Sequence, residues 1–436
     1  MRVFIAQKYE LGERWDPMMV AYRRNLSHFK YQPVSLASLL ISPPQYGANE
    51  SGIKRISEQQ VRYIRITDIN DNGLLNNNLG ATVERINAKY ILNHNDLLFA
   101  RSGATVGKTF LYKKNLYNYP CLFAGYLIKF QLNPSIVIPD YLFIYTQLSS
   151  YKDWIIATQR AAAQPNINAE EYKSLQVPLP PLTVQNKIYD IYHFAVLNKQ
   201  KKEQEAKDLL ASIDDYLLSE LGIERPTLAR TENGRFFYTS FKEITGGELA
   251  PISVQNRGKQ SKSTQYKEIK LSTIANVTKG QAITSKEIVD GEYPVIAGGQ
   301  SSPYTHNQYN HKGDVITVSA SGAYSGYVWY HDYPIFASDC SVIFSKDNNV
   351  FLTKYIYEIL RLRQKEIYLL QKGAGQPHVY ASDLAQITIP VVSIEKQMEI
   401  ILHCNNLRIA ADELTQEGKN LVESAKITIE AMILGE

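Results

Sequence analysis

A glycine-bounded segment in the first half of the chain has the residue types of a phosphate-binding loop. It reads Gly103-Ala104-Thr105-Val106-Gly107-Lys108-Thr109, and backbone amides, a lysine and a threonine hydroxyl are the groups that cradle nucleotide phosphates. The Walker A motif requires four residues between its glycines, whereas three lie here, and the position that would need glycine is Ser102. A similar stretch later in the chain has Tyr327 where the motif would need lysine. We therefore do not expect this chain to bind ATP.

Two further groups of residues approach catalytic motifs but are incomplete. Ser42-Pro43-Pro44-Gln45 lacks the aromatic residue with which adenine methyltransferases complete the clamp on the target amino group, and no glycine-rich cofactor fingerprint follows a predicted strand. Asp140, Glu171 and Lys173 are the residue types of a metal-dependent nuclease. Asp140, however, follows a proline at a predicted helix start, where a capping role explains it, and the other two fall in a polar helix. The histidines form no HExxH motif, so the sequence predicts no catalytic centre, metal or cofactor in this chain.

Polar, glycine-containing segments occur at matching places in the two halves of the chain and have the side chains that read DNA. Arg, Lys, Asn and Gln make paired hydrogen bonds to base edges, and Ser, Thr and backbone amides suit phosphates. Ordinary polar loops are the alternative, and for any single residue the sequence does not decide between the two. The candidate DNA-binding residues are Arg65, Thr67, Asp68, Asn70, Arg101, Ser102, Lys108, Arg160, Gln164 and Asn166 in the first half, and Gln300, Ser301, Ser319, Ser321, Tyr324, Lys372, Gln376 and His378 in the second.

The two halves are copies of each other. Val177-Pro178 through Gln185 matches Ile389-Pro390 through Gln397, and the offset from Pro178 to Pro390 is 212 residues. Further matches in the same order are Arg2-Val3-Phe4 with Arg235-Phe236-Phe237, Asp96-Leu97-Leu98 with Asp314-Val315-Ile316, Ser102-Gly103-Ala104 with Ser321-Gly322-Ala323, and Phe123-Ala124 with Phe336-Ala337. A period of this length indicates domain duplication rather than a solenoid. Because the polar loops differ between the copies, we expect the two domains to recognise different targets.

Each copy contains short β-like runs with turn residues between them, such as Tyr63–Thr67 followed by Asp71-Asn72-Gly73, and then a helical stretch near Tyr141 or Tyr355. After the proline boundary of each copy, a segment of roughly 40 residues has the apolar spacing of an amphipathic helix about 60 Å long. Its apolar positions are Ala206, Leu209, Ile213, Leu217 and Leu221 in the first copy, and Leu414, Leu421, Ala425, Ile429 and Ile433 in the second. We expect the two helices to pair antiparallel, as in a coiled coil; the alternative is that each helix packs on its own domain.

The predicted architecture is therefore α+β and pseudo-two-fold, with two similar mixed domains joined by two long antiparallel helices. The boundaries are residues 1–181 for the first recognition domain, 182–222 for the first helix, 223–393 for the second domain with its linker, and 394–434 for the second helix. A chain of 436 residues is long enough for two hydrophobic cores.

Composition is that of a globular protein, with 44% hydrophobic and 21% charged residues. A net charge of +4 requires that any DNA-binding charge be local. The cysteines Cys121, Cys340 and Cys404 are far apart in sequence, which argues against a zinc cluster or a disulfide framework. With no apolar leader and no run long enough to cross a membrane, we expect a cytoplasmic protein.

The run Tyr63–Asn70, the run Asp96–Lys108, the boundary Pro178–Gln185 and the long helix after it resemble the specificity subunit of Type I restriction-modification enzymes. The resemblance covers nearly the whole chain, although the second copy departs from it at Pro390–Ser393. It implies two target recognition domains that each read half of a split sequence in double-stranded DNA, and helices that set the spacing and dock two modification subunits. S-adenosylmethionine, ATP and Mg²⁺ would then belong to the modification and restriction subunits and not to this chain.

Rival functions remain at this stage. The chain could serve a related, Type IIB-like restriction-modification system that uses the same kind of subunit. A fused restriction endonuclease would need metal-site carboxylates that we do not find. A coiled-coil scaffold with two protein-binding modules would show no salt-dependent binding to duplex DNA, since phosphate contacts make affinity fall with salt.

Overall fold

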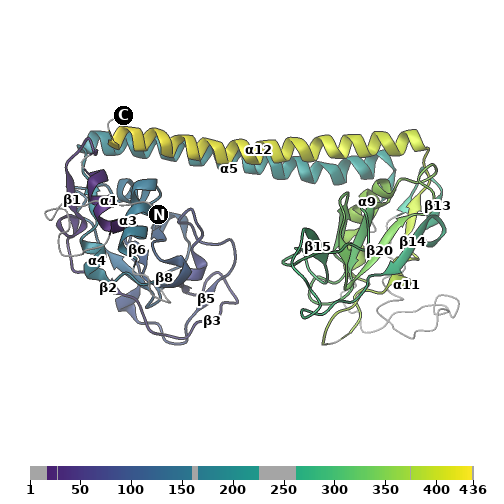
Figure 1. Cartoon of the computed structure of the whole chain (residues 1–436), viewed down its shortest axis with the longest axis horizontal. Coiled ribbons are helices and arrows are strands. Elements are labelled where there is room, and N and C mark those ends of the chain that lie inside the picture. The colour runs from purple at the N-terminus through teal and green to yellow at the C-terminus, as the bar shows by residue number, and fades with distance from the viewer. Residues whose placement is uncertain (1–16, 27, 160–164, 225–261, 374, 435–436) are drawn as a thin grey trace. The chain divides into compact units, whose positions relative to one another are not determined.

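The computed structural model describes residues 17–26, 28–159, 165–224, 262–373 and 375–434 (Figure 1). They belong to two compact units. Unit 1 consists of residues 1–203 and 415–436, and unit 2 of residues 204–414. Each unit thus contains one mixed domain together with one part of each long helix.

Unit 1 is built on two four-stranded sheets. One is antiparallel in the order β2 (Gln45–Tyr46), β9 (Leu127–Phe130), β6 (Leu97–Ala100), β7 (Thr109–Leu111). The other has the order β3 (Ile53–Lys54), β5 (Ala81–Thr82), β4 (Arg62–Ile64), β8 (Cys121–Phe123), with β4 and β8 parallel. Strands β1 (Pro33–Ser35) and β10 (Gln176–Pro178) form an antiparallel pair. The helices are α1 (Pro17–Leu26), α2 (Pro139–Tyr145), α3 (Ser149–Thr158) and α4 (Ala169–Lys173), with short 3-10 turns at η2 (Leu36–Leu39), η3 (Ile66–Asp68), η4 (Ala88–Tyr90), η5 (Gly103–Thr105) and η6 (Lys114–Leu116).

Unit 2 has the same plan. Its antiparallel sheet has the order β14 (Ala275–Lys279), β20 (Cys340–Ser345), β17 (Val315–Ser319), β18 (Val328–His331). A smaller sheet has the order β16 (Thr305–His306), β15 (Tyr293–Ile296), β19 (Phe336–Ala337), with β15 and β19 parallel. Two further pairs are β13 (Glu268–Lys270) with β21 (Thr388–Pro390), and β11 (Ile223–Glu224) with β12 (Lys262–Ser263). The helices are α8 (Leu271–Ile274), α9 (Thr353–Leu362), α10 (Gln364–Tyr368) and α11 (Ala381–Leu384).

The duplication predicted from sequence is confirmed by strand order. Strands β2, β9, β6 and β7 correspond in order to β14, β20, β17 and β18, and the parallel pair β4–β8 corresponds to β15–β19. The sequence matches fall on these elements: Leu97-Leu98 lies in β6, Val315-Ile316 in β17, and Phe336-Ala337 in β19. Each unit is therefore one copy of the same mixed domain, as the repeat predicted.

The repeated motif after each proline boundary has a structural explanation in its glutamine. Gln185 is fully buried; its Oε1 accepts a hydrogen bond from the Ile138 amide at 2.8 Å, and its Nε2 donates to the Pro180 carbonyl at 2.9 Å. Gln397 is equally buried and makes the corresponding bonds in unit 2: its Oε1 accepts from the Leu352 amide at 2.8 Å, and its Nε2 donates to the Val392 carbonyl at 3.2 Å. Each glutamine therefore ties the start of a long helix to the loop that precedes α2 or α9, because buried backbone groups need partners.

The long helices are α5 (Leu182–Glu220) and α12 (Ile394–Leu434). In unit 1, Ile188 of α5 lies in one hydrophobic core with Ile429 of α12, and in unit 2, Leu217 lies in a core with Cys404. Lys202 bonds Glu417 in unit 1, and the ring of Tyr216 contacts that of His403 at 4.0 Å in unit 2. As residue numbers rise along α5, those of its partners fall along α12, so the helices run antiparallel, as predicted. The sequence left two alternatives, helices paired with each other or helices packed on their own domains. Both kinds of contact are present, because each helix also contributes to the hydrophobic core of the units that it crosses.

Three details differ from the sequence predictions. Leu421 was expected on the apolar stripe of α12 but is exposed, and Val422 is buried in its place. Asp140 does not cap α2, since the N-terminus of this helix has no side-chain cap; its carboxylate instead pairs with Lys113 at 2.7 Å. The run Tyr63–Thr67 is only partly a strand, because β4 ends at Ile64 and a 3-10 turn begins at Ile66. The N-terminal match and the linker of 225–261 lie outside the described residues.

Candidate nucleic-acid interface

In unit 1, loops distant in sequence meet beyond the ends of β4 and β6. The Arg101 amide donates to the Tyr126 carbonyl at 3.0 Å, and the Gly103 amide donates to the Pro165 carbonyl at 3.0 Å. Ser102 forms an antiparallel bridge with Asn166. Since β4 and β8 are parallel, Arg65 leaves the sheet at the same edge as the turn that contains Tyr126. The fold thus gathers the predicted residues Arg101, Ser102 and Asn166, with Arg65 at the same edge.

Several of the predicted residues of unit 1 use their polar groups within the chain. Arg65 pairs with Asp68 through two hydrogen bonds of 3.0 Å, and Asp68 also accepts from the Arg65 amide at 2.9 Å. The hydrogen bond to Asp68 raises the pKa of Arg65 above its ordinary value. The Asn70 side chain accepts from the amides of Asn72 and Leu74 and so closes the following turn. The carboxylate of Asp68 is buried and occupied by these bonds, which argues for a structural role.

Lys108 joins the loop after β6 to the turn after η3. Its Nζ lies 2.7 Å from the exposed carboxylate of Asp71, and this contact lowers the pKa of Asp71. Thr67 is exposed in the same segment, and its carbonyl accepts from the side chain of Asn76. An exposed ion pair of this kind exchanges readily for other partners, because surface pairs contribute little free energy. Lys108 thus remains available to a phosphate.

Arg101 is held in place but lacks an anionic partner among the described residues. Its guanidinium lies over the Tyr46 ring, 5.0 Å from the ring centroid, and its Nε is buried without a hydrogen-bond partner. The Tyr46 hydroxyl is fixed in turn, since it accepts a hydrogen bond from the Ala169 amide at 3.1 Å. Tyr46 was not among the predicted residues, because only the fold brings β2 beside the loop after β6. A pre-positioned guanidinium of this kind suits the paired acceptors of a guanine edge or a phosphate.

In unit 2 the three predicted loops also meet, around Ser321. Ser321 bridges His378, and the Gly322 amide donates to the Pro377 carbonyl at 3.1 Å, as Gly103 does to Pro165. A Cβ added at Gly298 would lie 2.7 Å from the Ser321 carbonyl, so this position needs glycine for the loop after β15 to approach. The hydroxyl of Ser321 donates to Asp339, a residue that the sequence did not single out.

The remaining predicted residues of unit 2 differ in exposure. Gln300, Ser301, Tyr324 and Gln376 are exposed, and the ring of His378 stacks on that of Tyr380 at 6.2 Å between centroids. Lys372 pairs with Asp383 at 2.9 Å. Ser319 and, in unit 1, Ser102 are buried, which argues against direct contact between their side chains and DNA. Arg160 and Gln164 lie outside the described residues, so their places remain predictions.

The two sites present different chemistry at equivalent positions. The carbonyl of Arg101 accepts from the Ile167 amide, and that of Ala320 accepts from the Val379 amide, so Ala320 stands where unit 1 has its arginine. In unit 2 the polar groups nearest this point are Ser321, Asp339 and His378. A carboxylate accepts hydrogen bonds from cytosine or adenine amino groups, whereas arginine donates to guanine. The two sites therefore present different hydrogen-bonding groups at equivalent positions.

Neither a metal site nor a membrane-spanning segment is found in the described part of the chain. No group of three His, Cys, Asp or Glu residues is arranged to hold an ion among the residues that the structure describes. None of the helices there is long and apolar enough to cross a membrane. Cys121, Cys340 and Cys404 are buried and unpaired, and burial raises the pKa of each thiol to about 12.

Comparison with known proteins finds one family over most of the chain. The model of the Type I restriction modification DNA specificity domain matches twice, over residues 50–207 and 263–424. A Mycoplasma pneumoniae protein named as a type I specificity subunit, S.MpnORF638P, is 22% identical over 291 residues, which are 65% of this chain and 70% of that protein. The specificity subunit of the Type I restriction enzyme MjaVIII from Methanocaldococcus jannaschii is 25% identical over 132 residues, 28% of this chain and 29% of that protein.

The fold is shared with a solved structure from work on complex assembly and conformational transition of the type I restriction-modification system. The two chains superpose with a TM-score of 0.53 at 13% sequence identity, and the match covers 93% of this chain and 96% of the other. At this level of identity the likeness concerns the fold. It covers both copies of the mixed domain and both long helices.

Proposed function

The chain belongs to the family of Type I restriction modification DNA specificity domains, and on that premise we propose that it is the sequence-recognition subunit of a Type I restriction-modification complex. Each unit reads one half of a bipartite target in double-stranded DNA. The chain itself performs no chemistry. Modification subunits supply adenine methylation with S-adenosylmethionine, and restriction subunits supply ATP- and Mg²⁺-dependent translocation and cleavage, all in the cytoplasm.

The observation that carries this proposal is the pairing of equivalent loop clusters with unlike side chains. Both units bring the loop after β6 or β17 against the segment before α4 or α11 through the same backbone bonds, from Gly103 to Pro165 and from Gly322 to Pro377. A duplicated scaffold with divergent residues at its loop edge fits two readers of different half-sites. A purely structural scaffold gives no reason for Arg101 to be held without an anionic partner among the residues that the structure describes.

Exposed apolar residues on the long helices support docking of two modification subunits. In unit 1, Leu197 of α5 and Ile427 of α12 are 49% and 69% exposed, and in unit 2, Leu210 and Ile409 are 47% and 56% exposed. Leu197 and Ile409 are equivalent positions of the repeat, at the same offset as Pro178 and Pro390. Contiguous exposed apolar surface is typical of interaction sites. Exposed apolar residues on both helices in each unit would suit two copies of one partner.

The experiment that tests the proposal is methylation mapping. The chain is combined with its modification subunit and a DNA library, and methylated adenines are located by sequencing. We expect methylation only within a split motif with a fixed spacer. Exchanging residues 31–178 for the corresponding part of another specificity subunit should change one half-site and leave the other intact. Methylation unrelated to a split motif, or a change in both halves, would contradict the proposal.

A related Type IIB-like system is the second candidate, because it uses the same kind of recognition chain. The two are separated by the reaction of the assembled complex: cleavage on both sides of the target indicates the related system, and ATP-dependent cleavage at a distance indicates Type I. In either case this chain supplies the recognition.

A further inference from the structure

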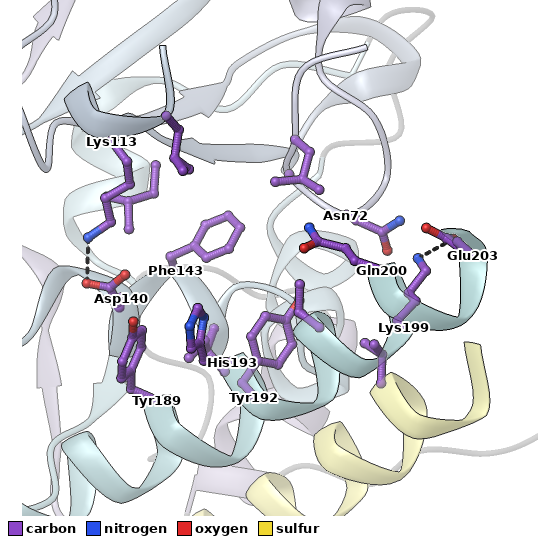
Figure 2. A pocket seen from close by; sticks show the side chains of 17 residues that line it. Asn72, Lys113, Asp140, Phe143, Tyr189, Tyr192, His193, Lys199, Gln200 and Glu203 are labelled. Atoms are coloured by element: carbon purple, nitrogen blue, oxygen red, sulfur yellow. Dashed lines mark hydrogen bonds and ion pairs between the residues drawn. The ribbon is translucent and has the colours of Figure 1, made fainter. Parts of the chain in front are cut away.

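Unit 1 has a pocket between its mixed domain and α5 whose lining includes none of the residues predicted to bind DNA (Figure 2). Its volume is about 220 Å³, and apolar walls come from Phe143 and Ile144 of α2, Val196 of α5 and Val422 of α12. Figure 2 shows one ion pair at each end, Lys113–Asp140 at 2.7 Å and Lys199–Glu203 at 3.7 Å. A cavity of roughly 150 Å³ with apolar walls is enough to bind benzene. The pocket therefore has room for one large apolar group.

At the equivalent place in unit 2 the chain carries an ion pair. Tyr141 and Tyr355 are equivalent, since each donates its hydroxyl to the proline carbonyl of the boundary, Pro178 or Pro390. Three residues later, Ile144 of α2 corresponds to Glu358 of α9. At the offset of the long helices, Val196 of α5 corresponds to Arg408 of α12.

Glu358 of α9 and Arg408 of α12 form an ion pair at this place in unit 2. Arg408 donates to both carboxylate oxygens of Glu358, at 2.7 and 2.6 Å, and lies 5.5 Å from the centroid of the Tyr357 ring. Glu358 is fully buried. In unit 1 both members of this pair are apolar, and shorter Val196 leaves the space open. The two units thus share this arrangement of helices, but Val196 and Ile144 stand in unit 1 where unit 2 has the charged pair Arg408 and Glu358.

We propose that the pocket of unit 1 receives one large uncharged side chain, aromatic or aliphatic, from the modification subunit that docks on this unit. This inference rests on the proposed function. It follows that two identical modification subunits bind the two units with unequal affinity, because the apolar Val196 and Ile144 line the pocket of unit 1 where unit 2 has the Arg408–Glu358 ion pair. An apolar side chain buried in such a pocket is the usual form of an interface hot spot.

The chemistry of the pocket selects an uncharged side chain. The ion pairs at its ends are each complete, and Ile144 offers no carboxylate to a cation where unit 2 has Glu358. Leu116, which also lines the pocket, is 65% exposed, so the opening is apolar as well.

The source of the occupant is indicated by the surroundings. Leu197, which is exposed on α5, directly follows the pocket residue Val196, so a partner that covers Leu197 lies beside the pocket. In the other unit, moreover, the side chains of Arg408 and Glu358 occupy the equivalent positions. Both observations favour a side chain of a docked protein over a small molecule.

The test measures the two stepwise dissociation constants of the modification subunit for the full chain, by native mass spectrometry and calorimetry. The double variant Val196→Arg/Ile144→Glu rebuilds the pair of unit 2 in unit 1 and fills the pocket. We expect the tighter constant to weaken by about tenfold or more, and the weaker one to stay within about twofold. Val196→Ala is the matched control: it enlarges the pocket without filling it, and both constants should stay within about threefold.

Circular dichroism shows whether the double variant Val196→Arg/Ile144→Glu, the filled variant, still folds. If it does not, a reciprocal variant in unit 2 tests the inference. Arg408→Val/Glu358→Ile removes both charges together and gives unit 2 the two apolar residues of unit 1. The modification subunit should then bind unit 2 more tightly, so the larger of the two dissociation constants should fall. Equal constants in the natural chain, or a folded filled variant with both constants unchanged, overturn the inference while leaving the proposed function intact. Failure of the modification subunit to bind either unit overturns both. Indole as a probe covers the other source: if it stabilises the isolated chain and the filled variant still binds its partner normally, the pocket is a small-molecule site and the inference is wrong.

Discussion

Arg101 differs from the other predicted cations of unit 1 that the structure describes in having no acid beside it. Arg65 is engaged by Asp68, and Lys108 by Asp71, whereas within the described part of the chain the guanidinium of Arg101 lies over the face of Tyr46. A half-buried guanidinium whose Nε has no hydrogen-bond partner carries a desolvation cost. Contact with DNA would relieve it, which is why this residue is the first choice for a base contact.

Replacing Arg101 with alanine in the complex should weaken binding to target DNA by about 1–3 kcal/mol and relax the preference at one position of one half-site, because a bidentate base contact is worth that much. Lysine at this position should restore affinity only in part, since it lacks the planar fork. Binding is measured by fluorescence anisotropy on a panel of single-base variants of the target. An equal loss on all sequences would instead assign Arg101 to a phosphate.

His331 makes unit 2 sensitive to acid. It is fully buried, its Nε2 lies 2.8 Å from the Thr317 hydroxyl, and burial lowers its pKa to about 4 from an ordinary value of 6.5. Because the folded state disfavours the protonated ring, the unfolded state takes up the proton first as the pH falls. Stability is therefore complete above pH 6.5 and is lost between 6.5 and 4, by up to about 3 kcal/mol at this site.

His331→Gln should remove that part of the pH dependence. Urea unfolding at pH 7.5 and pH 4.5 gives the difference for each protein, and the variant should lose less stability between the two values than the natural chain. Equal losses in the two proteins would mean that His331 titrates in the folded state much as it does in the unfolded chain.

At the level of single residues, the sequence pointed to loops that meet in the structure, but it did not show which of their side chains bond within the chain. The types and spacing of Arg65 and Asp68 suggested two DNA contacts, but in the structure they bond each other across a 3-10 turn. Tyr46 and Asp339 were missed because each reaches the site only through pairing of distant segments. Side chains in loops depend on such contacts, and no local pattern reports them.

The long helices show where an apolar pattern succeeds and where it misleads. Their positions were predicted closely, at 182–222 and 394–434, because each begins after a proline boundary and continues without another proline. The stripe of α12 was misplaced at Leu421. The buried positions Cys404, Ala411, Gly418 and Ala425 are seven residues apart, as in a coiled coil, but they are small. A search for large apolar residues does not find a helix contact made by small residues such as these.

At Gly418 of α12 the backbone lies close to Lys199 of α5. A Cβ added there would lie 3.3 Å from Cγ and 3.4 Å from Cα of Lys199. Alanine should therefore change the free energy of unfolding by less than about 1 kcal/mol, since slight crowding offsets its better helix propensity. Leucine has no room and should destabilise by about 1–3 kcal/mol.

Urea unfolding of Gly418→Ala and Gly418→Leu measures this difference. Lys419→Leu is the matched control, because the neighbouring side chain is exposed and should accept leucine within about 0.5 kcal/mol. If leucine were tolerated equally at both positions, the helices would not pack against each other at Gly418.

For the whole molecule, the internal repeat was the most reliable guide. Matched prolines, glutamines and glycines in a constant order predicted two copies of one domain, and each marks a place where the backbone has a fixed requirement: the buried glutamines Gln185 and Gln397, and the positive φ of Gly107 and Gly326. One difference between the units was not apparent from the sequence: Val196 lines a pocket in unit 1, whereas Arg408 pairs with Glu358 at the equivalent place in unit 2. It depends on which side chains meet across α2 and α5 or across α9 and α12.

If the paired helices set the distance between the two readers, their length should set the spacer of the DNA target. Four residues inserted in α5 between Gln204 and Glu205, and four in α12 between Glu413 and Leu414, lengthen both helices at a similar level of the pair. The addition is about 6 Å at 1.5 Å per residue, and duplex DNA rises about 3.4 Å per base pair. We therefore expect methylation mapping to return the same two half-sites with a spacer about two base pairs longer. Insertion in α5 alone is the control, and it should lower stability instead, because the seam then loses its register. An unchanged spacer in the stable double-insertion variant would show that something other than the helices fixes the distance between the half-sites.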